Sequence, residues 1–389
     1  MRIKDVDAHW LRCPIPYEKQ HVSDFGRLTT FDMTLVEVTT ENGLRGYGEA
    51  KAAVGSAGSC ASLVTTIRHE LRPMLIGQDA RHITRLWERM YNGTRAHYAL
   101  ARGRGFPVLG RRGLTIAAMS GVDMALWDVL GKSLGVPVAQ LLGGACRDAM
   151  PAYASGGWAD ADHIGEQLAG YVAHGFKAVK MRVGVMDGDV PASVARVRAA
   201  RDHLGPDVKI MVDAHGTFSV PEARRFCRAV EDCGLYWFEE PINADNRRGT
   251  AQVRAATSIP IAAGESEFTR FDIRDLIDAE AIDVVQPDTA IIGGVTETMR
   301  VAHLAHTYGL ELAPHLWGSA LSFMAGLHVA FASPAATILE FSLGANPMLH
   351  DLVEETIAAE DGMMAAPQRP GLGLTPRPAF VEEFRVEVG

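Results

Sequence analysis

The chain has 389 residues, of which 47% are hydrophobic, and a formal net charge of −9. This length and composition predict a globular protein with one large domain, one smaller domain and a sizeable core. The acidic balance argues against nucleic acid as a partner, because nucleic-acid-binding domains present a basic surface.

The start of the chain and its cysteines indicate a cytoplasmic location. The first residues, Met1-Arg-Ile-Lys-Asp, lack the apolar core of a signal peptide. No later run is expected to be long and apolar enough to span a membrane. The five cysteines are odd in number and scattered, without disulfide or zinc spacing, as is typical of proteins in a reducing cytoplasm.

The first third of the chain predicts an antiparallel sheet followed by helices. Residues 1–15 and 30–50 are expected to form strands, with a hairpin signal at Glu41-Asn42-Gly43. Segments 16–27 and 51–59 are expected to be loops. Helices are expected at about 60–76, 80–91 and 114–134, the last with an apolar stripe that belongs to the core. We therefore predict an α+β capping domain over residues 1–125.

An arginine-rich segment interrupts these helices at residues 91–113. It carries Arg95, Arg102, Arg104, Arg111 and Arg112 among several glycines. One interpretation is a solvated surface loop. The other is an insertion that reaches a neighbouring subunit or the mouth of an anion site. The run GRGFPVLG does not have the spacing of a phosphate-binding loop.

From about residue 151 short apolar strands alternate with helix-length segments. This alternation predicts an α/β fold, a (β/α)7–8 TIM-like barrel over residues 126–350 with the N-terminal α+β capping domain beside it. The tail, residues 351–389, is expected to return to that domain. The predicted barrel strands lie at 152–155, 178–183, 210–213, 236–239, 261–263, 284–286, 310–314 and 337–340.

Ionisable residues recur at the ends of these strands, about 25 residues apart. Barrel enzymes carry their active sites at the carboxyl ends of the strands, so this series predicts a catalytic site there. On the second strand, Lys180 and Arg182 point to the same face because side chains alternate. The residues in the series are Asp213, Glu239, Glu265, Asp288, His315 and Glu340.

Asp213, Glu239 and Glu265 come from three adjacent predicted strands and form a cluster of oxygen ligands. Hard divalent cations such as Mg²⁺ prefer oxygen ligands, so we predict one Mg²⁺ per subunit. The alternative is that these carboxylates pair with lysine and arginine in a salt-bridge network. Opposite them, Asp288 is expected to orient the imidazole of His315 and raise its basicity.

A metal with opposed acid–base groups suits removal of a proton α to a carboxylate. Lys180 would help stabilise the negative charge of the intermediate. Glu340 would donate a hydrogen bond to a carboxylate oxygen of the substrate if burial keeps it protonated. The expected partner is therefore a small carboxylate, with no membrane or nucleic acid involved.

The motifs resemble the enolase superfamily, in its mandelate racemase subgroup. The resemblance implies that Asp213, Glu239 and Glu265 bind Mg²⁺, that His315 and Asp288 form a dyad, and that Glu340 is an electrophile. It also implies a homo-oligomer, from dimer to octamer. The motifs, in chain order, are SGVDMALWD (120–128), GFKAVKMRVG (175–184), VDAHG (212–216), WFEEP (237–241), AGES (263–266), QPD (286–288) followed by IGG (292–294), and PHLWG (314–318).

Two positions depart from the pattern of the resembling family. Its Lys-x-Lys is Lys180-Met181-Arg182 here. The guanidinium group of arginine stays protonated near neutral pH, so it does not easily serve as a base. Arg182 is therefore expected to bind the substrate carboxylate. His215 stands where many members carry asparagine, and is expected to act as general acid, or alternatively to orient Asp213.

The expected reaction is dehydration of an aldonic or aldaric acid to a 2-keto-3-deoxy acid. His315 takes the α-proton, and His215, or His315 itself, protonates the departing hydroxyl group. Cycloisomerisation of a sugar-acid lactone, of the galactarolactone type, is the first alternative. Racemisation or epimerisation of a 2-hydroxy acid is the second. A zinc hydrolase would need His-x-His after the first strand, which residues 152–163 lack, and a non-catalytic binding protein would not need the ligands.

Overall fold

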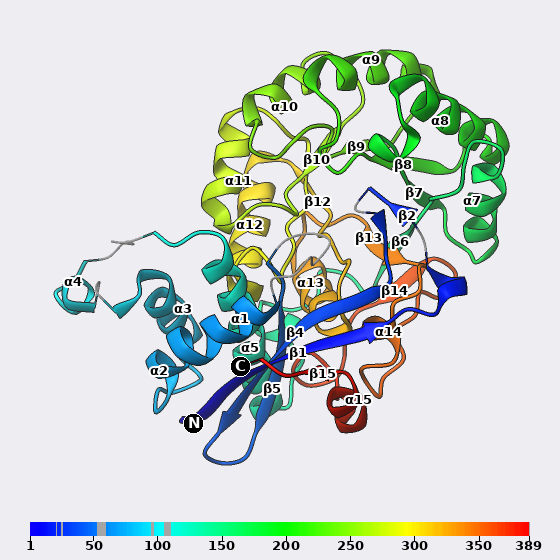
Figure 1. Cartoon of the computed structure of the whole chain (residues 1–389). Helices are drawn as coiled ribbons and strands as arrows, with labels where there is room; N and C mark the ends of the chain where they lie inside the picture. Colours follow the sequence, from blue (N-terminus) through cyan, green and yellow to red (C-terminus); the bar gives the residue numbers. More distant parts are fainter. Residues whose placement is uncertain (21, 25, 53–59, 95–96, 105–109, 389) are drawn as a thin grey trace.

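The computed structural model describes residues 1–388 apart from residues 21, 25, 53–59, 95–96 and 105–109. An antiparallel sheet and a parallel barrel ringed by helices lie side by side (Figure 1). The predicted fold class, an α/β barrel with an α+β capping domain, is confirmed.

The antiparallel sheet has the strand order β15-β1-β4-β5. Its hairpin turns where Glu41-Asn42-Gly43 predicts it, because Gly43 adopts a positive φ of 85° that glycine accepts without strain. The last strand of the tail pairs antiparallel with β1 (Figure 1). The strands are β1 (Ile3–Pro14), β4 (Thr30–Thr40), β5 (Arg45–Ala50) and β15 (Arg385–Val386).

The predicted helices of the capping region are present with small shifts. The first is continuous but contains a π-helical stretch, Ile67–Leu71. The segment predicted as loop 16–27 holds a short hairpin, β2 (Val22–Ser23) with β3 (Gly26–Arg27). Residues 53–59 of the other predicted loop lie outside the described residues. The helices are α1 (Cys60–Thr66), α2 (Arg72–Leu75), α3 (Ile83–Asn92), α4 (His97–Ala101), α5 (Leu114–Leu134) and α6 (Val138–Leu141).

Helix α5 corrects the expectation that no run is long and apolar enough to span a membrane. By length and composition this helix passes that test, but 78% of its most apolar window is buried inside the protein. It is a core helix, and one of its faces contacts the start of α12. Ser120 accepts a hydrogen bond from the Gly293 amide, and Asp123 accepts from both the amide and the hydroxyl of Thr296. The SGVDMALWD motif thus joins the capping region to the barrel.

The barrel strands run parallel in the order β12-β11-β10-β9-β8-β7-β6-β13. A bridge between Leu312 and Ala336 joins the two ends of this order. The strands are β6 (Ala149–Ser155), β7 (Ala178–Arg182), β8 (Lys209–Asp213), β9 (Trp237–Glu239), β10 (Ile261–Ala263), β11 (Val284–Val285), β12 (Glu311–Leu312) and β13 (Leu339–Ser342).

Helices follow the barrel strands and cover the outside of the sheet (Figure 1). After β13 comes only the short α14 (Pro347–His350), and β14 (Met363–Ala365) and α15 (Pro378–Glu383) belong to the tail. The covering helices are α7 (Ile164–Ala173), α8 (Val190–Leu204), α9 (Val220–Val230), α10 (Arg247–Arg254), α11 (Thr269–Asp278), α12 (Gly294–Tyr308) and α13 (Ala320–Ala332).

The interior of the barrel is a packed apolar layer to which each strand region contributes one residue. Trp237 and Tyr153 meet edge to face with ring centroids 5.4 Å apart. This packing fixes the strand ends above it, where side chains of the site begin. The layer comprises Tyr153, Ala178, Met211, Trp237, Ala262, Val284, Ala313 and Ile338.

Candidate active site

Three carboxylates lie at the carboxyl ends of adjacent barrel strands. Asp213 and Glu239 end β8 and β9 and are paired in register, and Glu265 lies two residues beyond β10. All three are at most 1% exposed. Buried carboxylates need a cation or hydrogen-bond donors nearby, so the contacts of each oxygen decide what this cluster can hold.

Two cations from β7 occupy part of the cluster. Lys180 Nζ lies 2.6 Å from Glu239 Oε1 and 3.0 Å from Glu340 Oε1, and Arg182 contacts Asp213 Oδ2. The salt-bridge network is therefore present for Asp213 and Glu239. As placed, no group of three histidine, cysteine, aspartate or glutamate side chains among the described residues could hold a metal ion.

Glu265 is the carboxylate of the cluster that pairs with neither Lys180 nor Arg182. Neither of its oxygens accepts a hydrogen bond, although both are buried. Burial raises the pKa of Glu265 to about 8, and the nearby carboxylates of Glu240 and Glu239 add to the rise. A buried carboxylate without donors has the oxygen chemistry that Mg²⁺ prefers. Asp213 and Glu239 offer the same chemistry, but in this structure their oxygens are engaged by Arg182 and Lys180.

His315 faces this cluster from beyond β12. Its Nδ1 lies 2.7 Å from Asp288 Oδ2 and its Nε2 lies 3.6 Å from Glu265 Oε2. Burial alone would lower the pKa of His315, but the carboxylates of Glu265, Asp288 and Glu340 raise it above its usual range. The contact with Asp288 occupies Nδ1, which leaves Nε2 as the atom that can exchange a proton with a ligand.

His215 faces the cluster from the other side, with a positive φ of 44°. Its Nδ1 lies 2.6 Å from Asp24 Oδ2, and its Nε2 lies 3.5 Å from Asp213 Oδ2. Burial, and next the Arg182 cation, lower the pKa of His215 to about 4. Its backbone amide also donates to Asp213 Oδ1 at 2.9 Å, so both functions expected for His215 are compatible with its position.

Glu340 does not meet the condition set for a hydrogen-bond donor. It lies inside β13 rather than at its end, and its Oε2 accepts from the Leu316 amide at 2.9 Å. Burial would raise the pKa of Glu340, but Lys180 and His315 hold it below its usual range. Glu340 is therefore an anion that accepts hydrogen bonds and holds Lys180.

Two residues of this site, Lys51 and Asp24, were not found from the sequence. Lys51 lies 2.6 Å from Asp288 Oδ2, and Asp24 holds His215. Both belong to the capping region, so no strand–helix repeat points to them. Lys51 carried one weak signal, a lysine among small residues in the run Gly48-Glu-Ala-Lys-Ala-Ala.

The arginine-rich segment makes contacts within its own chain. Arg111 pairs with Glu70 at 2.7 Å, and Arg112 donates to the hydroxyl of Tyr91 at 2.9 Å. Arg95 lies outside the described residues. These contacts favour the interpretation of a surface segment for Arg111 and Arg112.

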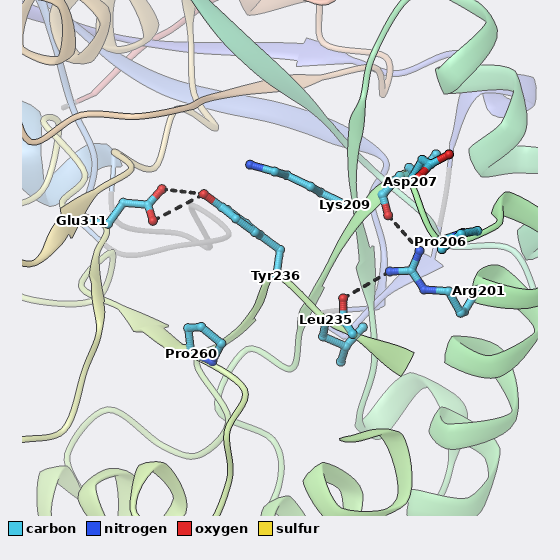
Figure 2. Close-up of a pocket in the computed structure, with 10 residues that line it drawn as sticks. Arg201, Pro206, Asp207, Lys209, Leu235, Tyr236, Pro260 and Glu311 are labelled. Atoms are coloured by element: carbon cyan, nitrogen blue, oxygen red, sulfur yellow. Dashed lines mark hydrogen bonds between the residues drawn. The ribbon is translucent and has the colours of Figure 1, made fainter. Parts of the chain in front are cut away.

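Two cavities differ in their relation to the site. One of about 320 Å³ lies at the opposite, N-terminal end of the strands (Figure 2). Three of its polar side chains contact one another: the Tyr236 hydroxyl donates to Glu311, and Lys209 Nζ lies 4.0 Å from the centre of the Tyr236 ring. The other, of about 700 Å³, adjoins His215 through Asp24 and is the candidate space for a substrate. It is lined by Val22, Asp24, Gly26, Trp158, Ala159, Val185 and Met186.

Family profiles match nearly the whole chain. The profile described as Mandelate racemase / muconate lactonizing enzyme, N-terminal domain, matches residues 11–143. The profile described as Enolase C-terminal domain-like matches residues 163–380.

Curated relatives match over almost their full lengths. Arabinonate dehydratase of Saccharolobus solfataricus is 34% identical, with 91% of each chain covered. D-galactonate dehydratase of Ralstonia nicotianae is 36% identical, with 92% of this chain and 93% of the relative covered. D-galactarolactone cycloisomerase of Agrobacterium fabrum is 32% identical, with 99% of each covered.

Solved structures agree with these matches. A putative mandelate racemase from Bordetella bronchiseptica superposes with a TM-score of 0.89 at 35% identity, covering 100% of this chain and 96% of the other. A racemase from Streptomyces coelicolor, described with bound magnesium, superposes with a TM-score of 0.86 at 30% identity, covering 99% and 100%.

Proposed function

This chain belongs to the mandelate racemase / muconate lactonizing enzyme family of the enolase superfamily, and from that premise we propose that it dehydrates a sugar acid. The product is a 2-keto-3-deoxy acid. The observation that carries the proposal is the pair of imidazoles, His315 and His215, on opposite sides of the acidic cluster. Dehydration needs removal of the α-proton and protonation of the departing hydroxyl group, and two imidazoles can divide these two steps. The relatives named arabinonate and D-galactonate dehydratase support this reaction.

His315 removes the proton α to the substrate carboxylate through Nε2, while Asp288 holds Nδ1. His215 is the group placed to deliver a proton to the departing β-hydroxyl group, and a substrate carboxylate on Arg182 would offset the positive charge that lowers the pKa of His215. Arg182 binds the substrate carboxylate, because a guanidinium group presents two parallel donors to two oxygens. Lys180, held by Glu340, stabilises the charge that develops on those oxygens.

We assign one Mg²⁺ per subunit to Asp213, Glu239 and Glu265, whose donor chemistry fits this ion. When bound, Mg²⁺ supplies positive charge that stabilises the developing dianion and offsets the charge of Glu265 beside His315. Lys180 and Arg182, which pair with Glu239 and Asp213 here, would be available to the substrate if these carboxylates held the ion.

Cycloisomerisation of a sugar-acid lactone is the second candidate. The D-galactarolactone cycloisomerase matches this chain over 99% of both lengths, and its reaction would need the same base. Racemisation ranks third, because Arg182 replaces the lysine that would act as the opposing base.

The test is a screen of aldonic and aldaric acids with Mg²⁺, read by semicarbazide and mass spectrometry. Dehydration predicts a semicarbazone and a product lighter by one water. A product of unchanged mass without semicarbazone would favour cycloisomerisation or racemisation instead. The five cysteines are all free, which supports the proposed cytoplasmic location, and the homo-oligomeric state stays a prediction.

A further inference from the structure

Lys51 is a buried cation that the capping domain supplies to the barrel. It directly follows β5, and its side chain is only 4% exposed. Its Nζ lies 2.6 Å from Asp288 Oδ2, the same oxygen that lies 2.7 Å from His315 Nδ1. It also donates to the carbonyl of Trp317. The dyad is therefore a triad of contacts: lysine, aspartate and histidine around one carboxylate oxygen.

The backbone around Lys51 is fixed on the barrel at two further points. The Lys51 amide donates to the carbonyl of Ala290 at 3.1 Å. Two residues earlier, Glu49 accepts from the amide and the hydroxyl of Ser319, at 2.9 and 2.7 Å. Side chains alternate along a strand, so Glu49 and Lys51 share one face of the end of β5. That face lies on the segments that carry Asp288 and His315.

Lys51 remains charged in this position. Burial would lower its pKa, but Asp288 and Glu49 raise it above its usual range. A buried ion pair is weak as a source of stability, because removing two charges from water offsets their attraction. Its stronger effect is on orientation. With Lys51 on Oδ2 and the Ala290 amide on Oδ1 at 2.8 Å, the Asp288 carboxylate has one orientation, which directs His315 Nε2 toward the cluster.

We propose that Lys51 is a positioning residue for the reaction: its ammonium group holds the Asp288 carboxylate against His315, so that the base is correctly placed only when the capping domain is seated. This inference rests on the proposed function, because it takes His315 as the group that removes the substrate proton. It adds the capping domain to the acid–base machinery.

The test compares Lys51→Met with wild type as full-length, Mg²⁺-loaded enzymes. A misplaced base slows proton removal, so kcat should fall about 10- to 100-fold while KM changes less than about threefold. The kinetic isotope effect on kcat with α-deuterated substrate should rise. The matched control is Lys132→Met. Lys132 Nζ lies 2.7 Å from the buried Asp128 carboxylate, and this ion pair is outside the site. That control should lower Tm and leave both kcat and the isotope effect unchanged.

Lys51→Gln keeps a hydrogen-bond donor without the charge and gives the same readouts if Lys51→Met does not fold. A kcat within threefold of wild type, or a loss confined to KM, would overturn the inference while the proposed function stands. A wild-type enzyme that forms no keto acid and exchanges no α-proton with any acid sugar overturns both.

Discussion

The regions around His315 and His215 have the same local geometry and opposite electrostatics. Each imidazole places Nδ1 against an aspartate, Asp288 at 2.7 Å and Asp24 at 2.6 Å. Yet the pKa of His315 is raised, whereas the pKa of His215 is lowered to about 4. An aspartate partner alone therefore does not decide the proton affinity of a buried histidine.

The wider surroundings make the difference. His315 stands among carboxylates, Glu265 and Glu340, which favour its protonated form. His215 stands beside the cations Arg182 and Lys180, which disfavour it. The charges of the wider surroundings, and not the aspartate partner, therefore set the proton affinity of each imidazole.

Replacing His315 should have the largest effect. His315→Asn removes the group proposed to accept the α-proton, so keto-acid formation should fall on the order of 10³-fold. Steady-state assay of the Mg²⁺-loaded enzyme measures it. The control is His328→Asn, because His328 is also buried but lies outside the site and accepts from the Ala139 amide. Equal losses in the two variants would remove the special role of His315.

Replacing His215 should separate the two halves of the reaction. His215→Asn removes the proposed acid for the departing hydroxyl group, so elimination should fall about 10²-fold. Exchange of the α-proton in D₂O should persist, because His315 is intact. Proton NMR of the substrate follows the exchange. If exchange and elimination fell together, His215 would not have a separate role.

His328 gives a reference for burial without charged neighbours, and the smallest expected effect. Burial lowers its pKa from 6.5 to about 4. As pH falls below about 6.5, the unfolded chain binds a proton at His328 while the folded protein keeps this histidine neutral. The contribution of neutral His328 to the free energy of unfolding is therefore complete above about pH 6.5 and is lost as pH falls toward 4. The shift corresponds to about 3 kcal/mol at most. In urea titrations between about pH 7 and pH 4, the free energy of unfolding should fall less for His328→Asn than for wild type. An equal fall in both proteins would contradict this prediction.

The sequence predicted the parts of the site that follow from the strand–helix repeat. Asp213 and Glu239 end their strands as the repeat requires, and the fold class and family are confirmed. Lys51 and Asp24 were not identified from the sequence, because they reach the site from the capping region through packing of one domain on another. The charge state of Glu340 depends on its contact with Lys180, which lies on a distant strand in the sequence, so the residues next to Glu340 in the chain do not predict it.

The lengths of strands were also predicted less well than their order. His315, expected at the end of its strand, lies three residues beyond β12, and Asp288, expected just after its strand, lies three residues beyond β11. A backbone bridge between these two residues brings them together all the same. Alternation along the chain indicates where a strand lies, whereas its last ladder hydrogen bond depends on its neighbours.

The acidic cluster that both imidazoles face is the centre of this account, and calorimetric titration of EDTA-treated protein with Mg²⁺ tests it most directly. The expected result is one Mg²⁺ per chain, with binding lost in Glu265→Gln and kept in Glu311→Gln, whose carboxylate lies at the opposite end of the barrel. Absence of Mg²⁺ binding by the wild type, or binding that Glu265→Gln leaves unchanged, would contradict the account.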